Sequence, residues 1–129
     1  MPNQAQGNFD VKITPVAEDK GAGSTLGRMT IDKVFHGDIT GTSKGEMLTV
    51  STDAGSAVYV AVERISGTLH GKQGSFALVH QGIATANGQE LAIFVAPDSG
   101  SGELVGLTGK MTLDLSGGGH AYILEYSLS

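Results

Sequence analysis

The sequence predicts an all-β protein, an eight-stranded antiparallel up-and-down barrel with no long helix. Apolar residues alternate with polar ones at the two-residue period of a strand, and they nowhere recur at helical spacing over three turns. About eight such stretches follow one another with short connections, which place consecutive strands antiparallel. The 20 glycines fall between the apolar runs, as turn residues do. Eight strands are enough to close a small barrel; a β-sandwich is the alternative.

Residues 56–81 are the central stretch, and they predict two long strands joined by a glycine-rich turn at residues 71–74. On the first strand Val58, Val60 and Val62 share one face, because side chains alternate across a strand. The opposite face carries Tyr59, Ala61 and Glu63, and on the second strand Phe76, Leu78 and His80 share a face. Both faces of this hairpin are largely apolar, which indicates a closed barrel or a covered sheet.

The first half of the chain predicts three more strands. Residues 9–14 form an amphipathic strand that ends near Pro15, because proline lacks the N–H that a ladder needs. A loop at residues 18–24 leads to a strand at 28–40, and a tight turn at 41–45 leads to a strand at 46–51. Lys33 falls on the apolar face of its strand. Either its ammonium reaches past the strand end, or Gly37 marks a bulge that re-aims the strand.

The second half of the chain predicts the remaining strands. Asn87-Gly88 is a strong hairpin dipeptide before a strand at residues 90–96, because a type I′ turn needs positive φ at both central positions. Residues 97–102 are a turn cluster, and residues 104–115 are a strand bent at Gly106 and Gly109. The glycines at 117–119 turn into the last strand, residues 120–128.

Charge and composition exclude several classes of function. The net charge is −5 and the eight Lys and Arg are scattered, so the chain lacks the basic stripe that nucleic-acid binding needs. It has no cysteine, which excludes disulfides, thiolate catalysis and cysteine-type zinc sites. No apolar run approaches the ~18 residues of a membrane helix, and the first residues are too polar for a signal peptide. We expect a cytoplasmic protein with a disordered lead at residues 1–7 and a single β-barrel domain at residues 8–129.

Six polar residues with apolar neighbours are the candidates for ligand binding: Glu46, Tyr59, Glu63, His80, Tyr122 and Tyr126. If Tyr59, Glu63 and His80 all face the barrel interior, they form a carboxylate–imidazole–phenol cluster that offers a general acid and base. The alternative is a satisfied structural network in which Glu63 pairs with an arginine or lysine. In either case we expect Glu63 to point inward and to meet a tyrosine hydroxyl, His80 or a basic side chain, since buried charges are rarely unpaired.

The histidines and glycine-rich turns do not predict a cofactor. The chain has four histidines, His36, His70, His80 and His120. No two of them lie at the i, i+2 spacing that puts two metal ligands on one strand face. Residues 100–102 resemble a phosphate-binding loop superficially, but they lack the lysine and the following helix that such a loop needs. We therefore predict no metal site and no cofactor, and whether the protein is an enzyme stays open.

Seven short motifs resemble those of the DUF3224 family, small bacterial proteins of unknown function. They are residues 33–38 (KVFHGD), 41–48 (GTSKGEML), 59–64 (YVAVER), 74–80 (GSFALVH), 96–100 (APDSG), 106–109 (GLTG) and 120–126 (HAYILEY). The resemblance implies a barrel like that of allene oxide cyclase, within the broader calycin-like set, and often an oligomer. The family carries no established activity, so no catalytic residue follows from it. Ser101 departs from the threonine expected there but keeps the hydroxyl.

Three classes of function remain. The first hypothesis is that a small lipophilic ligand binds in or at the mouth of the barrel, which needs an interior left partly empty. An isomerase or cyclase, by analogy with allene oxide cyclase, needs that cavity and placed polar groups, whereas a structural oligomeric module has a filled interior. We also expect a homodimer or other homo-oligomer, because an outer apolar stripe on residues 58–62 and 92–96 needs a cover. No nucleic-acid or membrane partner is predicted.

Overall fold

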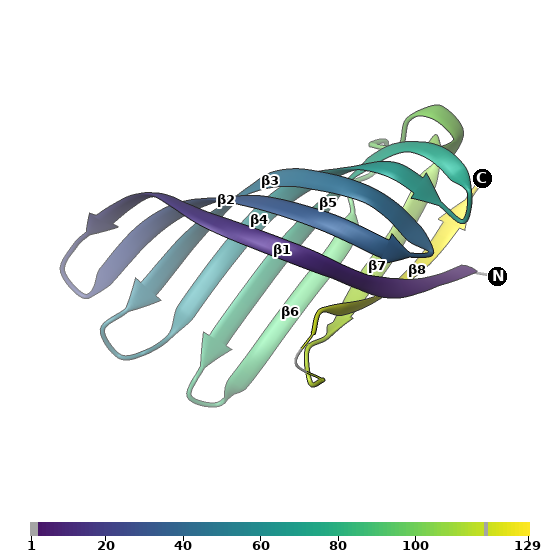
Figure 1. Ribbon diagram of the computed structural model, residues 1–129. Coiled ribbons are helices and arrows are strands. Elements are labelled where there is room, and N and C mark those ends of the chain that lie inside the picture. The colour runs from purple at the N-terminus through teal and green to yellow at the C-terminus, as the bar shows by residue number, and fades with distance from the viewer. Residues whose placement is uncertain (1–2, 118) are drawn as a thin grey trace.

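Eight antiparallel strands close into a barrel in the computed structural model, which describes residues 3–117 and 119–129 (Figure 1). The strands are β1 (Asn3–Lys20), β2 (Ser24–Gly37), β3 (Ile39–Thr52), β4 (Ala57–Leu69), β5 (Lys72–Thr85), β6 (Gly88–Val95), β7 (Leu107–Asp114) and β8 (Ala121–Leu128). Each strand pairs with the next along the chain, and β8 pairs with β1. A single 3₁₀ turn, η1 (Gly102–Leu104), precedes β7. The predicted all-β, up-and-down barrel is confirmed.

The barrel has two distinct ends. The turns after β1, β3 and β5 lie together at what we call the hairpin end, on the left and lower left in Figure 1. The turns after β2 and β4, the 3₁₀ turn, the start of β1 and the C-terminus lie at the other end, the terminal end. The described residues contain no helix long and apolar enough to cross a membrane.

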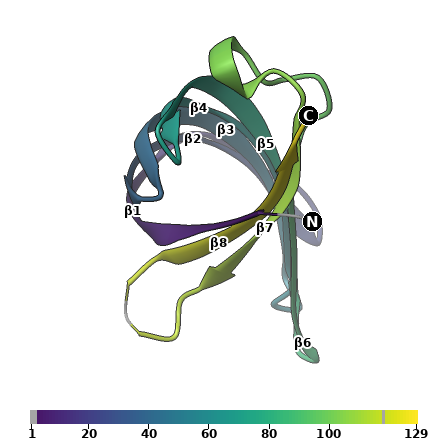
Figure 2. The same ribbon diagram turned by 90° about the vertical axis from the view of Figure 1, so that its right-hand side faces the viewer.

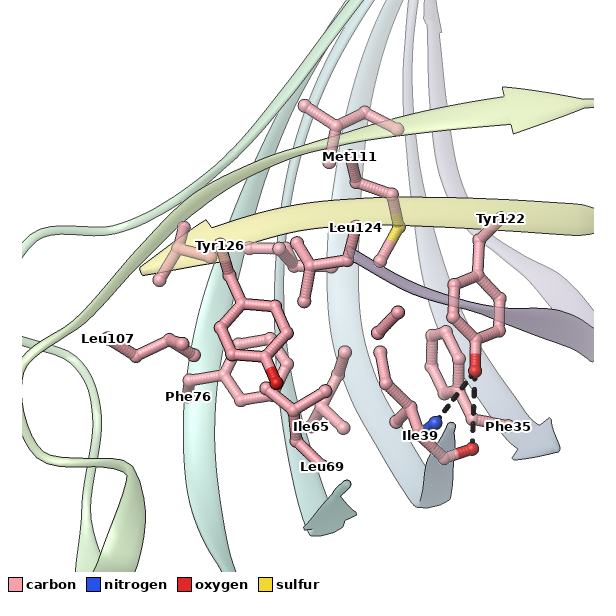
Figure 3. Close-up of a cluster of buried hydrophobic side chains, with 14 of the residues drawn as sticks. Phe35, Ile39, Ile65, Leu69, Phe76, Leu107, Met111, Tyr122, Leu124 and Tyr126 are labelled. Atoms are coloured by element: carbon pink, nitrogen blue, oxygen red, sulfur yellow. Dashed lines mark hydrogen bonds between the residues drawn. The ribbon is translucent and has the colours of Figure 1, made fainter. Parts of the chain in front are cut away.

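The hydrophobic core fills the terminal end. Inward side chains from every strand pack there, as Figure 3 shows for ten labelled residues. The largest fully buried side chains are Phe35, Ile39, Ile65, Leu69, Phe76, Leu78, Leu104, Leu107, Tyr122 and Leu124. Each belongs to the inward set of a strand with a two-residue period, apart from Leu104, which comes from the 3₁₀ turn. This end of the barrel is therefore closed by packing.

The strands of the first half are longer than the sequence pattern predicts. Residues 41–45 are not a turn but part of β3, and residues 18–20 and 24 belong to β1 and β2 rather than to a loop. Gly41 and Gly45 lie where neighbouring strands approach closely: a Cβ at Gly45 would lie 2.7 Å from the Cβ of Glu63. These glycines relieve crowding inside the barrel, so they are not turn residues. The predicted strand end near Pro15 is wrong: β1 continues to Lys20, and the proline is accommodated by a register shift between Pro15 and Ala17.

The expected disordered lead is wrong for residues 3–7. They open β1 and pair with β8, and Ala5, opposite Leu124, is fully buried. Without this segment β8 would have a free edge, so pairing here closes the barrel. Residues 1 and 2 lie outside the described residues, as does residue 118 within the predicted 117–119 turn.

Two hairpin turns show where glycine is needed. The β4–β5 turn is formed by His70 and Gly71, with φ of 48° and 80°, so it comes before the predicted turn at 71–74. The predicted hairpin at Asn87-Gly88 is confirmed as the β5–β6 connection, with positive φ at Gly88 (134°) but not at Asn87. This turn is therefore not of the predicted type I′.

The seam between β6 and β7 is the weakest part of the barrel wall. These strands share two residue pairs, Ile93 with Met111 and Phe94 with Lys110. Towards the hairpin end β6 diverges from β7 and β8 (Figure 2). Strand β7 is also shorter than the predicted strand at residues 104–115, because Leu104 lies in the 3₁₀ turn. The barrel is thus tightly closed at one end and open at the other.

Candidate functional site

The two tyrosines of β8 complete the closed terminal end. The hydroxyl of Tyr122 accepts a hydrogen bond from the backbone N–H of Ile39 at 2.9 Å (Figure 3). It donates to the carbonyl of His36 at 3.0 Å. The hydroxyl of Tyr126 pairs with Nδ1 of His70. Burial raises the pKa of both phenols. Both hydroxyls are held by groups in or next to the turns after β2 and β4, so these two candidate ligand residues tie strands together at the terminal end.

A charged cluster lies in the middle of the barrel, beyond the hydrophobic core. Lys33 Nζ of β2 lies 2.8 Å from Glu63 Oε2 of β4, and His80 Nε2 of β5 lies 3.4 Å from the same oxygen. The exposed fractions of these side chains are 8% for Lys33, 0% for Glu63 and 6% for His80. We call these three residues the buried triad. The expectation that Glu63 points inward and meets His80 or a basic side chain is confirmed.

The sequence builds the buried triad through strand alternation. Lys33 follows Ile31 at the two-residue period, and Glu63 follows Tyr59 and Ala61 in the same way. Gly45 is the register partner of Glu63 and leaves room for its side chain. The ammonium of Lys33 also lies 4.7 Å from the ring centroid of Phe9, a cation–π contact at the edge of the core. Neither alternative for Lys33 is correct: it neither reaches past the strand end nor is re-aimed by a bulge.

Glu63 is ionised in this environment. Burial is the largest influence on the carboxyl group and raises its pKa, since it disfavours the charged form. The interaction with His80 and the positive charge of Lys33 outweigh that effect, so the pKa of Glu63 lies below its ordinary value of 4.5. Glu63 is therefore a buried carboxylate at neutral pH.

The polar atoms of this region have unused hydrogen-bonding capacity. Within the described chain, Ser43 Oγ and Glu63 Oε1 are buried without a hydrogen-bond partner, and His80 Nε2 has only its 3.4 Å contact with Glu63. Ser43 is the register partner of Lys33 on the inner face of β3. Buried polar groups are nearly always paired, so such atoms mark a place where another polar group fits.

A cavity of about 560 Å³ opens at the hairpin end. Its lining comes from β1 to β4: Pro15, Val16, Ala17, Glu18, Thr25, Gly27, Met29, Met47, Thr49, Val50, Ser51, Ala57, Val58 and Tyr59. Most of these side chains are apolar or small, and Glu18 is the one charged residue of the set. Met29, Met47 and Tyr59 pack with buried Ile31 and Ala61, which lie next to the buried triad along β2 and β4. The cavity and the triad are thus separated by one layer of side chains.

Tyr59 connects the cavity with the triad. It lines both this cavity and a second one of about 260 Å³ beside β5 and β6. Its ring lies against Gly82, where an added Cβ would lie 2.8 Å from Cδ1 of the ring. Burial and, next, the negative charge of Glu63 raise the pKa of the Tyr59 phenol. Tyr59 is therefore a neutral hydrogen-bonding group at the floor of the cavity.

Glu46 does not belong to the site. It lies on the outer face of β3, about half exposed, where its carboxylate pairs with Arg28 at 2.7 Å. The structure brings Tyr59, Glu63 and His80 to one side of the barrel interior, as the cluster hypothesis requires. Sequence reasoning missed Ser43 and did not assign Lys33 to the cluster. The signal for Lys33 is its position in register with Ile31 and Phe35 on an otherwise apolar face.

These features define a small β-barrel protein whose interior is filled at one end, charged in the middle and hollow at the other. The chain belongs to the family described as protein of unknown function (DUF3224), whose model matches residues 5–126. It is similar to a crystal structure of a DUF3224 protein of unknown function from Shewanella oneidensis MR-1. The two chains are 42% identical, the match covers 100% of this chain and 99% of that one, and the TM-score is 0.93. No curated protein matches this chain. The family resemblance of the sequence motifs is confirmed.

Proposed function

We propose that this protein binds a small, largely apolar molecule in the cavity at the hairpin end. The observation that carries the proposal is the cavity itself, about 560 Å³ with a mainly apolar lining, in a barrel whose hydrophobic core fills the other end. Small-molecule sites are concave and mostly apolar, with a few polar groups, and they often occupy the mouths of β-barrels. A volume of this size accommodates a ligand of a few hundred daltons.

The floor of the cavity supports the same class of ligand. Met29 and Met47 are unbranched thioethers with several rotatable bonds, so they adapt to apolar molecules of different shape. Tyr59 supplies one hydrogen-bonding group beside them. The charged residue of the lining, Glu18, lies at the rim near the β1–β2 turn. This arrangement favours a neutral apolar ligand over an ion.

The binding test uses N-phenyl-1-naphthylamine, a neutral probe that fluoresces in apolar surroundings. The wild-type protein should give saturable binding at one site per chain. Thr49→Trp, which fills the cavity from β3, should weaken binding about ten-fold or more, equivalent to about 1.4 kcal/mol. Thr42→Trp is the matched control, because Thr42 is exposed on the outer face of the same strand. The absence of saturable binding, or equal binding by the two variants, contradicts the proposal.

A cyclase- or isomerase-type enzyme, by analogy with allene oxide cyclase, is the alternative and would use the same cavity. Fold analogy alone is a weak warrant for an activity. The described cavity lining lacks the ionised side chains of the triad, which lie one layer deeper. Binding therefore has the more direct support.

We also propose that two copies of the chain associate through the outer face of β3 to β6. One cross-strand row there runs from Glu46 through Val62, Val79 and Phe94 to Lys110 on β7. Val62 and Phe94 are 57% and 42% exposed, and Leu48 and Val60 extend the apolar surface in the adjacent row. Two such rows packed antiparallel would bury the apolar centre and set Glu46 of each copy against Lys110 of the other.

A further inference from the structure

We infer that the ligand of this barrel carries a neutral hydroxyl group, which reaches the buried triad through the floor of the cavity. The inference rests on the proposed binding function and extends it from the apolar body of the ligand to its polar end. Three buried polar atoms without a hydrogen-bond partner in the described chain support it: Ser43 Oγ, Glu63 Oε1 and His80 Nε2. None of these residues belongs to the cavity lining, so the hydroxyl has to pass the side chains that separate them from the cavity.

The unpartnered atoms set the chemistry of the group that fits them. Glu63 is ionised, so Oε1 accepts a hydrogen bond but cannot donate one. The hydroxyl of Ser43 donates or accepts, and it lies opposite Lys33 in the β2–β3 register. A ligand hydroxyl can donate to Glu63 Oε1 while accepting from Ser43. A single such group would satisfy two buried atoms that otherwise stay unpaired.

Charge argues against an acidic ligand. The positive charge of Lys33 is already opposed by Glu63 at 2.8 Å, and the ammonium also lies near the rings of Phe9 and Phe35. A ligand carboxylate would bring a second negative charge to a buried site that already holds one, and like charges in such a site repel strongly. An ether carries no charge, but it only accepts hydrogen bonds and would leave Glu63 Oε1 without a donor. The site therefore favours a ligand group that both donates and accepts a hydrogen bond.

The layer between cavity and triad contains two side chains that can move, Met29 and Met47. They pack with Ile31, Tyr59 and the small side chain of Ala61. Gly45 on β3 and Gly82 on β5 add no side-chain bulk to the interior beside this layer. Rotation of the two methionine side chains would let a hydroxyl pass from the cavity to Ser43 and Glu63 while the apolar body stays in the cavity.

The test compares three ligands of matched length as competitors of N-phenyl-1-naphthylamine: 1-decanol, 1-methoxynonane and decanoate. Wild-type protein should bind 1-decanol about ten-fold more tightly than either of the others, the effect of roughly one well-made buried hydrogen bond. Ser43→Ala should remove most of this preference. It should also leave the thermal unfolding midpoint unchanged or raised, because it deletes a buried hydroxyl that has no partner. Ser66→Ala, an exposed serine on β4, is the matched control and should keep the preference.

The possible outcomes separate the hydroxyl inference from the binding proposal. If the probe binds but 1-decanol shows no preference over the ether and the carboxylate, the hydroxyl inference is overturned and the binding proposal stands. The same holds if Ser43→Ala keeps the full preference. If the probe does not bind to wild-type protein, both fail. Should Ser43→Ala not fold, the ranking of the three ligands on wild-type protein still supports or overturns the inference.

Discussion

Lys33 Nζ lies 2.8 Å from Glu63 Oε2, and both side chains are almost entirely withdrawn from water in the middle of a β-barrel. Removing two charges from water costs several kcal/mol per ion, and this cost can exceed the energy of their mutual attraction. The loss of one partner is therefore far more damaging than the loss of both.

Replacing Lys33 alone should destabilise the protein strongly. Lys33→Met leaves the Glu63 carboxylate buried beside only His80, and we expect a loss of about 3 kcal/mol in the free energy of unfolding. The double variant Lys33→Met/Glu63→Gln removes both charges and should recover most of that loss. Urea unfolding measures both values. Lys44→Met, which removes a solvent-exposed partner of Asp32, is the control and should cost below about 0.5 kcal/mol. Equal stability of Lys33→Met and wild type would refute the buried ion pair.

Stability should fall in acid through Glu63. Its native pKa is lowered from 4.5, so its charge contributes stability that is fully present above pH 4.5 and lost as the pH falls through the lower native pKa. At pH 7, Glu63→Gln should unfold about 1–3 kcal/mol more easily than wild type, because Lys33 loses its partner. The difference should shrink as the pH falls below 4.5 and disappear below the native pKa, where the carboxyl of the folded wild-type protein is also neutral. Chemical unfolding at a series of pH values follows it, and a constant difference would count against this role of Glu63.

The contact between Tyr59 and Gly82 should not tolerate a methyl group. Gly82→Ala places a Cβ within 2.8 Å of Cδ1 of the tyrosine ring, and we expect overpacking to cost about 1–3 kcal/mol. Gly82→Ala combined with Tyr59→Leu removes the ring and should restore part of that loss. Gly117→Ala is the matched control, since a Cβ there has no atom within 4 Å. Thermal unfolding reports all of these variants; identical midpoints for Gly82→Ala and Gly117→Ala would disprove the contact.

Charge on the outer face should separate the proposed dimer. Wild-type protein should scatter light as about twice the 13.2 kDa chain at micromolar concentration. Val62→Lys places an ammonium in the centre of the apolar row and should give the monomer mass. Val105→Lys changes an exposed valine outside β3 to β6 and should leave the dimer intact. A wild-type mass of a single chain would rule out the association.

Strand alternation explains why the sequence predicts most of this fold. Side chains on a strand alternate between its two faces, and apolar neighbours mark the inner face. This pattern predicts the inward positions of Tyr59, Ala61 and Glu63 on β4 and of His80 on β5. The strand ends were harder to predict, because Gly41 and Gly45 are of a residue type common in turns but lie within β3. Their role depends on how closely β4 approaches, which is a property of the closed barrel and not of the local sequence.

The site was only partly predictable for the same reason. Local sequence places Lys33 on an apolar face but does not show that Glu63, from a strand two positions away in the barrel, lies opposite it. Glu46 has apolar neighbours in sequence, yet its position in β3 puts it outside with Arg28. Tyr122 is inward as alternation requires, but its partners, Ile39 and His36, are more than 80 residues away. Contacts between distant strands decide these roles.

The most direct test of the account is a crystal structure of the protein soaked with 10-bromo-1-decanol, with the bromine located by its anomalous signal. The cavity proposal predicts bromine at the hairpin end between the methionine floor and the rim near Glu18, and the hydroxyl inference predicts the oxygen beside Ser43 and Glu63. Bromine in the cavity with the hydroxyl turned to solvent would contradict the inference alone. Bromine on the outer face of β3 to β6, with the cavity empty, would contradict the claim that this barrel binds its ligand inside.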